Sequence, residues 1–268
     1  MLKLGLVSVS FRDKHPDEII DAAVNAGLEV IEWGSDIHAP CGNTERLLHI
    51  AEQQKLAGIK ECTYGTYFRI GVNSCNEIKA YIKAAKILGT RVLRVWCGNK
   101  PSCTYSEKEK QRIISDSRTI ADIAEAEGVK LCLEFHPYTY TDELKSAYEL
   151  ISTVNSPAFK MYWQPNQFRT AEENIISARK LAYCVENVHV FNWNGEKRFP
   201  LERACEEWYK YASAFKGEHI LMLEFMPDDN IASLSAEAES LRKIVRHINM
   251  DTAGVIKYAE NIPVRKCR

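Results

Sequence analysis

The fold is decided by one stretch, in which RVLRVWCG (Arg91–Gly98) and VKLCLEFHP (Val129–Pro137) flank SEKEKQRIISDSRTIADIAEAEG (Ser106–Gly128). The two flanking segments are short apolar runs that end in glycine or proline, which is typical of buried strands. The middle segment has helical spacing and ends in a glycine just before the second run. A strand, a helix and a second strand in this order predict a parallel pair joined by a right-handed crossover.

The same unit recurs along the whole chain. Helical segments such as PDEIIDAAVNAG (Pro16–Gly27) alternate with apolar runs, and their last residue is again glycine. The chain contains eight such apolar runs, LKLGLVSVS, LEVIEWG, IKECTYG, RVLRVWCG, VKLCLEFHP, FKMYWQP, VENVHVFNW and HILMLEFMP. Nearly continuous apolar strands require a sheet covered on both faces. Eight units in 268 residues, about 33 residues each, predict an α/β fold of the (β/α)8 TIM barrel type.

An open doubly wound sheet is the alternative fold. Such sheets usually carry a glycine-rich phosphate loop after the first strand, and SVSFRDKHP (Ser8–Pro16) is not one. No linker or low-complexity segment divides the chain. We therefore expect a single barrel over residues 1–250, followed by a C-terminal extension, 251–268, that has no clear period and whose structure the sequence leaves open.

Composition limits the partners and the location. The chain is 46% hydrophobic and 26% charged, and its formal net charge of -1 gives no reason to expect nucleic acid or an anionic membrane as a partner. The nine cysteines are scattered, without a CxxC pair, and are interpreted as reduced thiols. No signal peptide and no membrane-spanning run is recognised, so we expect a cytoplasmic protein. Homo-oligomerisation is left open.

Polar side chains end four successive apolar runs. They are Glu134 in CLEFHP, Gln164 in YWQPN, His189 in NVHVFNW and Glu224 in LMLEF. Any one of them, taken alone, is more often an ion-pair partner or a satisfied core residue than a ligand. The carboxyl ends of barrel strands meet at one face, where these four side chains would converge on a point at which a divalent cation offsets the buried charge.

The order of these residues resembles the xylose isomerase-like barrels, in particular the sugar phosphate isomerase/epimerase family, and the resemblance covers essentially the whole chain. It implies that Glu134, Gln164, His189 and Glu224 hold a divalent ion, with Mn²⁺ first and Mg²⁺, Co²⁺ or Zn²⁺ as alternatives. It also implies that Glu134 and Glu224 are the catalytic acid/base pair. Family members have aspartate where this chain has Gln164. The amide oxygen is a neutral ligand, so we expect weaker metal binding.

Eight further residues are expected to contact a small carbohydrate substrate, because loops and strand ends at this face of a barrel carry function. Arg94 would need an anionic partner, and a structural carboxylate is favoured over a substrate carboxylate or phosphate. His136 lies two residues after Glu134 and shares its side of the strand. Arg198 resembles a loop arginine of related epimerases. The full set is His38, Tyr64, Arg69, Arg94, Trp96, His136, Asn166 and Arg198.

These residues predict a metal-dependent isomerase or epimerase of a sugar or sugar phosphate, in which one glutamate removes a proton beside a carbonyl and the other returns it through an enediolate. One alternative is a lyase, which dehydrates a keto-sugar or keto-inositol at the same site. Another is a non-catalytic sugar-binding barrel with a weakened metal site, which the glutamine at position 164 suggests.

Overall fold

The predicted eight-stranded barrel is confirmed. The computed structural model describes residues 2–260, and the side chains of residues 2–250. Its barrel strands are β1 (Leu2–Val7), β2 (Val30–Gly34), β3 (Glu61–Ile70), β4 (Val92–Cys97), β5 (Lys130–Glu134), β6 (Phe159–Trp163), β7 (Val185–Val190) and β10 (His219–Leu223). They pair in parallel in the closed order β1-β10-β7-β6-β5-β4-β3-β2.

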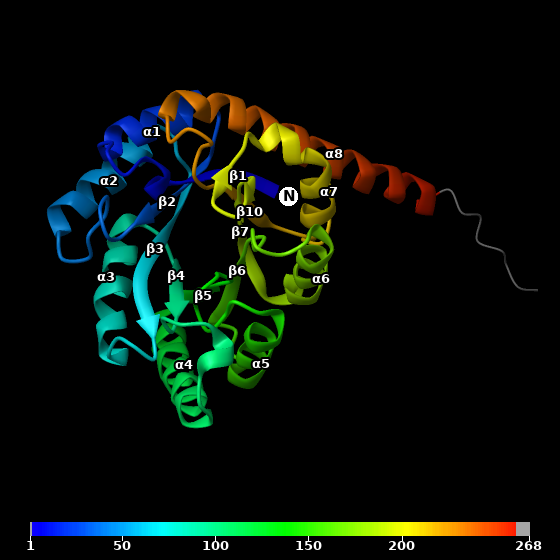
Figure 1. Ribbon diagram of the computed structural model, residues 1–268. Coiled ribbons are helices and arrows are strands. Elements are labelled where there is room, and N and C mark those ends of the chain that lie inside the picture. The colour runs from blue at the N-terminus through cyan, green and yellow to red at the C-terminus, as the bar shows by residue number, and fades with distance from the viewer. Residues whose placement is uncertain (1, 261–268) are drawn as a thin grey trace, which may run out of the picture.

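Helices surround the barrel, as Figure 1 shows in a view along the barrel. They are α1 (Pro16–Asn25), α2 (Thr44–Leu56), α3 (Ile78–Leu88), α4 (Glu107–Glu127), α5 (Leu144–Val154), α6 (Ala171–Leu181), α7 (Cys205–Ala212) and α8 (Leu234–Glu260). The last part of α8 extends past the ring of helices. Because α8 continues to Glu260, it crosses the expected domain limit at residue 250, and residues 261–268 lie outside the described chain.

Local sequence signals explain the helix ends. At the start of α4, Ser106 Oγ accepts a hydrogen bond from the backbone N–H of Glu109, whose carboxylate accepts one from the N–H of Ser106. This reciprocal pair satisfies two backbone donors that have no partner within the helix. The helix ends at Gly128, where φ is 66°. Glycine adopts this left-handed conformation at little cost, so the chain can turn directly into β5.

Strand side chains alternate between two cores. Those that point outward pack under the helices, and Trp163 of β6, for example, packs against Trp208 and Tyr211 of α7. Apolar side chains that point inward form a smaller cluster with Val9 of the turn after β1; its strand members are Val7, Cys132, Tyr162 and Met222. These inward side chains fill the barrel interior, so the polar residues at the strand ends lie directly above a packed apolar layer.

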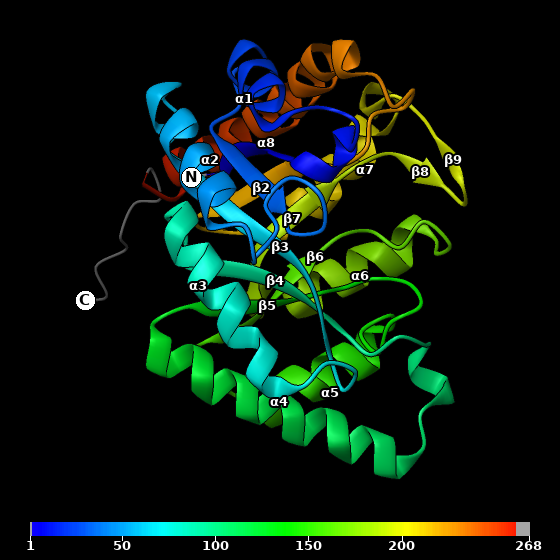
Figure 2. The ribbon, with the colours of Figure 1, turned by 90° about the vertical axis from the view of Figure 1, so that its left-hand side faces the viewer.

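Two local features depart from the predicted pattern. Strand β3 runs five residues beyond the predicted Gly65 and contains an irregularity between Gly65 and Arg69. The segment after β7 forms a hairpin of β8 (Trp193–Asn194) and β9 (Lys197–Arg198), which projects beyond one end of the barrel in Figure 2. Within the described residues, none of the helices is both long and apolar enough to cross a bilayer. The eight described cysteines are unpaired.

Candidate functional site

Four adjacent strands deliver the four predicted ligands to one place. Glu134 ends β5, Gln164 follows β6, His189 lies in β7, and Glu224 follows β10. All four are almost completely buried, and Glu224 is the most accessible at 8%. The residues just before them are buried apolar side chains that face the helices, Leu133, Trp163, Val188 and Leu223. Alternation along each strand therefore directs the polar side chain into the barrel.

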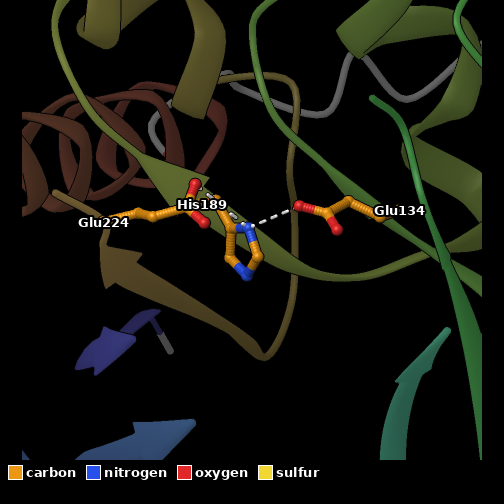
Figure 3. Close-up of side chains that lie close together, drawn as sticks. All are labelled: Glu134, His189 and Glu224. Carbon is orange, nitrogen blue, oxygen red and sulfur yellow. Dashed lines mark ion pairs between the residues drawn. The ribbon is translucent and has the colours of Figure 1, made fainter. Parts of the chain in front are cut away.

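The imidazole of His189 is the centre of this cluster. Its Nδ1 lies 3.2 Å from Gln164 Oε1, 3.3 Å from Glu134 Oε1 and 3.4 Å from Glu224 Oε2. Figure 3 shows the ring between the two glutamates, which approach it from opposite sides. One ligand atom from each of Glu134, His189 and Glu224 can be chosen so that all lie within 4.8 Å of one another. The structure thus brings together the residues that the sequence assigned to a metal ion.

A third buried carboxylate, Glu32 of β2, lies on the other side of the ring. Its Oε1 is 3.5 Å from His189 Nε2 and 3.3 Å from Arg94 Nε. Arg94 also pairs with Glu134, because its Nη1 is 3.0 Å from Glu134 Oε2. His189 Nε2 and Glu134 Oε2 lie at ion-pair distances from Glu32 and Arg94, but these contacts are not aligned as hydrogen bonds. The two buried atoms therefore lack a hydrogen-bond partner among the described residues. Arg94 therefore has two buried carboxylates of the protein, Glu32 and Glu134, as partners.

A glycine makes room for this ion pair. A Cβ at Gly65 of β3 would lie 2.6 Å from Glu32 Oε1 and 2.9 Å from Arg94 Nη2. Both distances are shorter than a van der Waals contact, so any larger residue would displace a charged group. The adjacent inward residue, Thr63, donates a hydrogen bond from Oγ1 to Glu32 Oε2 at 3.3 Å. The sequence of β3 is thus fitted to the buried pair.

The charges in the cluster set one another's protonation. Burial by itself would raise the pKa of Glu134, but the charge of Arg94 and the hydrogen bond from His189 outweigh it and hold this pKa below its usual range. Burial would lower the pKa of His189, but the carboxylates of Glu224 and Glu32 raise it well above its usual value. If His189 is neutral, the cluster has three negative charges, on Glu32, Glu134 and Glu224, and one positive charge, on Arg94. Two negative charges would then remain uncompensated.

Comparison with known proteins defines the family. The family model described as the xylose isomerase-like TIM barrel matches residues 20–201. The chain belongs to this family. The 3-dehydroshikimate dehydratase of Bacillus anthracis is 27% identical over 174 residues, a match that spans 60% of this chain and 60% of that relative's length.

Solved structures of the family share the fold. A probable 3-DHS dehydratase of Bacillus anthracis superposes with a TM-score of 0.71 at 20% identity, over 90% of this chain and 98% of its own. D-psicose 3-epimerase of Clostridium cellulolyticum gives 0.65 at 16% identity, over 92% and 99%. The IOLI protein with a bound zinc atom gives 0.68 at 18% identity, over 92% and 97%. At these identities the likeness establishes the barrel, and the chemistry depends on this chain's own residues.

The donor set fits a divalent ion of the kind that the family resemblance implies. Two carboxylates, an amide oxygen and an imidazole nitrogen converge, and such mixed oxygen and nitrogen sets suit Mn²⁺, Co²⁺ and Zn²⁺, while Mg²⁺ favours oxygen alone. One dipositive charge would also cancel the two negative charges that remain uncompensated. His189 would bind through Nδ1, and its Nε2 would face the Glu32 carboxylate at 3.5 Å; a carboxylate beside the second ring nitrogen is common for a ligating histidine.

Three of the predicted substrate residues form a stack above this cluster. The guanidinium carbon of Arg69 lies 3.9 Å from the centroid of the Trp96 ring, and the His136 ring stacks on Trp96 at 4.7 Å. The Cζ of Arg94 lies 5.8 Å from the same indole ring. The stack therefore lies next to the buried ion pair. A substrate contact for each of these residues stays a prediction.

His38 and Tyr64 instead have protein partners for their polar atoms. His38 contacts Ser8 Oγ at 3.0 Å through Nδ1 and the carbonyl oxygen of Phe11 at 3.2 Å through Nε2, and it is 1% exposed. Burial lowers the pKa of His38 to about 4, so the ring is neutral. The Tyr64 hydroxyl donates to the carbonyl of Ala39 at 2.7 Å. Their predicted substrate contacts would require these bonds to break.

Asn166 and Arg198 also make contacts within the protein. Asn166 Oδ1 accepts from the N–H of Phe168 at 3.0 Å, which shapes the turn before α6. Arg198 of β9 pairs with Asp229 and lies 4.9 Å from the ring centroids of both Trp193 and Phe225. The hairpin therefore holds Arg198 near the loop that follows Glu224. A substrate contact for either residue stays a prediction.

Two inward residues, Glu32 and Tyr67, were not among the predicted site residues. Glu32 lies in VIEWG, a charged residue within an apolar run, which is the same signal that identified Glu134 and Glu224. Tyr67 is the inward tyrosine of β3, because its ring lies 5.9 Å from that of Trp96. Counting alternate positions from Gly65 reaches Tyr67 and Arg69 and leaves Tyr64 on the outer face. Glu32 could therefore have been found from its charge within an apolar run, and Tyr67 from strand alternation.

Proposed function

We propose that the protein is a metal-dependent isomerase or epimerase that moves a proton at the carbon beside a carbonyl of a small polyhydroxylated substrate. The observation that carries this proposal is the placement of Glu134 and Glu224 on opposite sides of His189 Nδ1, 3.3 and 3.4 Å away. Two carboxylates that face each other across one point can remove and return a proton on either face of a planar intermediate. The fold and family support it.

The bound ion would supply a Lewis acid that stabilises negative charge on the substrate oxygen, with Mn²⁺ proposed first. The chain's residues supply the proton transfers. Arg94 lies 3.0 Å from Glu134 Oε2 and stabilises this carboxylate in its ionised form, so that uptake of a proton by Glu134 is disfavoured. Glu224 pairs with His189 and is the more exposed of the two. We therefore assign Glu224 as the group that takes the proton first and Glu134 as the group that acts on the other face.

A dehydratase is the second candidate. The match to a 3-dehydroshikimate dehydratase supports this alternative. The first step would be the same removal of a proton beside a carbonyl, and loss of a hydroxyl from the neighbouring carbon would follow, with water as the second product. A dehydratase forms an unsaturated product that absorbs in the ultraviolet, whereas an isomerase or epimerase conserves the number of double bonds.

Deuterium exchange tests the shared first step. The manganese-loaded protein is incubated in D₂O with a panel of ketoses, keto-acids and 3-dehydroshikimate, and exchange at the carbon beside the carbonyl is followed by proton NMR. We expect exchange with at least one compound, reduced on the order of a thousandfold in Glu224→Gln. Glu206→Gln, a change of an exposed glutamate on α7, is the matched control and should exchange like wild type. Full exchange by Glu224→Gln would disprove the assignment.

A further inference from the structure

Arg69 differs from the other arginines around the mouth of the barrel. Arg12 pairs with Asp36, Arg198 pairs with Asp229, and Arg94 pairs with Glu32 and Glu134. Arg69 is half-buried on the face of Trp96, and its guanidinium donates from Nη1 to the carbonyl of Gly98 at 2.9 Å. Among the side chains of residues 2–250, no carboxylate forms an ion pair with it. A guanidinium removed from water in this way normally has an anionic partner.

A second donor in the same stack also lacks a partner. Trp96 Nε1 is buried and has no hydrogen-bond acceptor among the described residues. Buried indole N–H groups are usually satisfied, so an unsatisfied one beside a half-buried guanidinium indicates a missing acceptor. The two groups are in direct contact, with the Arg69 guanidinium carbon 3.9 Å from the Trp96 ring centroid. Together they offer donors only and one positive charge.

The distance to the proposed catalytic centre suits a small molecule. Trp96 lies 5.8 Å from the guanidinium carbon of Arg94, and Arg94 reaches Glu134 Oε2 at 3.0 Å. A ligand group bound by Arg69 and Trp96 would thus be separated from Glu134 and Glu224 by about the thickness of the Arg94 side chain. One compact molecule can occupy both places if its anionic group is a few bonds from its carbonyl.

We propose that Arg69 and Trp96 form a carboxylate subsite, so that the substrate is a keto acid of the sugar-acid type rather than a neutral ketose. This inference rests on the proposed function for the position of the reacting carbonyl. A planar guanidinium fork matches the two oxygens of a carboxylate, and the single charge is balanced by a monoanion. A phosphate ester would bring up to two negative charges and three acceptor oxygens, for which one arginine and one indole N–H are too few donors.

Binding of matched compounds tests the subsite without any need for turnover. The probes are D-fructuronate and D-tagaturonate, compared with D-fructose and D-tagatose, in which the carboxylate is replaced by a hydroxymethyl group. D-fructose 6-phosphate is the phosphate probe. Calorimetry with manganese-loaded wild type should give at least about tenfold tighter binding of an acid than of its neutral partner, the range of one charge-assisted hydrogen bond.

The variants assign the preference to this stack. We expect Arg69→Gln to reduce the acid preference at least about tenfold and Trp96→Phe, which keeps the ring but removes the N–H, to reduce it by a smaller factor. Arg12→Gln changes an arginine that already has a carboxylate partner and should keep the wild-type preference. Unchanged manganese affinity and melting temperature in Arg69→Gln would show that the variant remains folded.

Several results would overturn the subsite. They are equal or tighter binding of the neutral ketoses, tighter binding of the phosphate ester than of the acids, an acid preference that survives Arg69→Gln, or no binding of either acid. Failure of the proposed function is distinguishable, because the acids would still bind in an Arg69-dependent way while no compound exchanged deuterium. Exchange with a neutral ketose that is indifferent to Arg69 would instead reject the subsite and keep the catalytic assignment.

Discussion

Two buried histidines in this barrel have opposite surroundings. His38, in the loop after β2, meets the Ser8 hydroxyl and the Phe11 carbonyl, and its pKa is lowered to about 4. His189, at the centre of the barrel, meets the carboxylates of Glu134, Glu224 and Glu32 and the amide of Gln164, and its pKa is raised well above the usual value. The exposed fractions are only 1% and 0%, so burial does not separate them.

The difference between the two histidines identifies the region of the barrel in which buried negative charge exceeds positive charge. Both ring nitrogens of His38 contact neutral oxygen atoms, so the ring needs no further partner. Around His189 the carboxylates outnumber the one permanent cation, Arg94, and a positive charge must come from a proton on the ring or from a bound ion. Buried polar groups of equal accessibility can thus be structural or reactive, and the balance of charge distinguishes the two.

The largest effect on stability should come from removing Arg94, the permanent cation among the carboxylates around His189. Arg94→Met leaves Glu32 and Glu134 buried without that partner, and we expect the free energy of unfolding to fall by about 3–5 kcal/mol. Urea denaturation measures it. Lys86→Met is the matched control, because its ion pair with Glu127 is exposed and should contribute at most about 1 kcal/mol. Equal losses of unfolding free energy in the two variants would mean that the buried ion pairs of Arg94 stabilise the fold no more than an exposed ion pair does.

A smaller loss should follow from crowding the same ion pair without removing a charge. Gly65→Ala would place a methyl group 2.6 Å from Glu32 Oε1, and displacement of the carboxylate should cost about 1–3 kcal/mol of unfolding free energy. Gly42→Ala adds the same methyl group where no atom lies within 4 Å. The control should stay within about 0.5 kcal/mol of wild type. A Gly65→Ala protein as stable as the control would show that the pair moves freely.

Acid should act on the neutral region through His38. Because the folded pKa of about 4 lies below the unfolded value of 6.5, the unfolded chain binds a proton first as the pH falls through this window. Stability is therefore full above pH 6.5 and declines toward pH 4, by about 2 kcal/mol at pH 5 for this group alone. The difference in unfolding free energy between pH 7.5 and pH 5 should shrink by this amount in His38→Gln. An unchanged difference would contradict the neutral assignment.

The smallest expected effect tests the neutral ligand. Gln164→Asp adds a third carboxylate near His189 Nδ1, so we expect about tenfold or more tighter binding of Mn²⁺, corresponding to about 1.4 kcal/mol. Competition with a chelator of known affinity measures the change. Gln167→Asp, on the loop that follows, is the control for added charge and should leave the affinity nearly unchanged. Weaker binding of Mn²⁺ by Gln164→Asp than by wild type would mean that the amide oxygen of Gln164 is not directed at the metal.

The sequence predicted the features that depend on local patterns. The apolar runs located every barrel strand, and glycine at the end of α4 predicted the turn into β5. The hairpin β8–β9 was missed, although Gly195, whose φ is 58°, is a common residue at the first position of a two-residue hairpin turn. The outward position of Tyr64 followed from alternation within β3 and was not used.

Long-range pairing accounts for the rest. Glu32 and Arg94 are 62 residues apart, and only the closed barrel shows that they form one ion pair. The Gly65 that accommodates this pair looks like any strand-end glycine in the sequence. The unpaired state of Arg69 is likewise visible only when every carboxylate around it has been placed.

The central claim is that the region around His189 holds a divalent ion despite the glutamine. Elemental analysis of protein purified without chelator tests it most directly, with wild type, Glu134→Ala and Gln164→Asp measured side by side. We predict close to one ion per chain in wild type, its loss in Glu134→Ala, and retention in Gln164→Asp. A wild type without metal, together with a Gln164→Asp variant that fills, would contradict the account and favour a sugar-binding barrel with an inactive site.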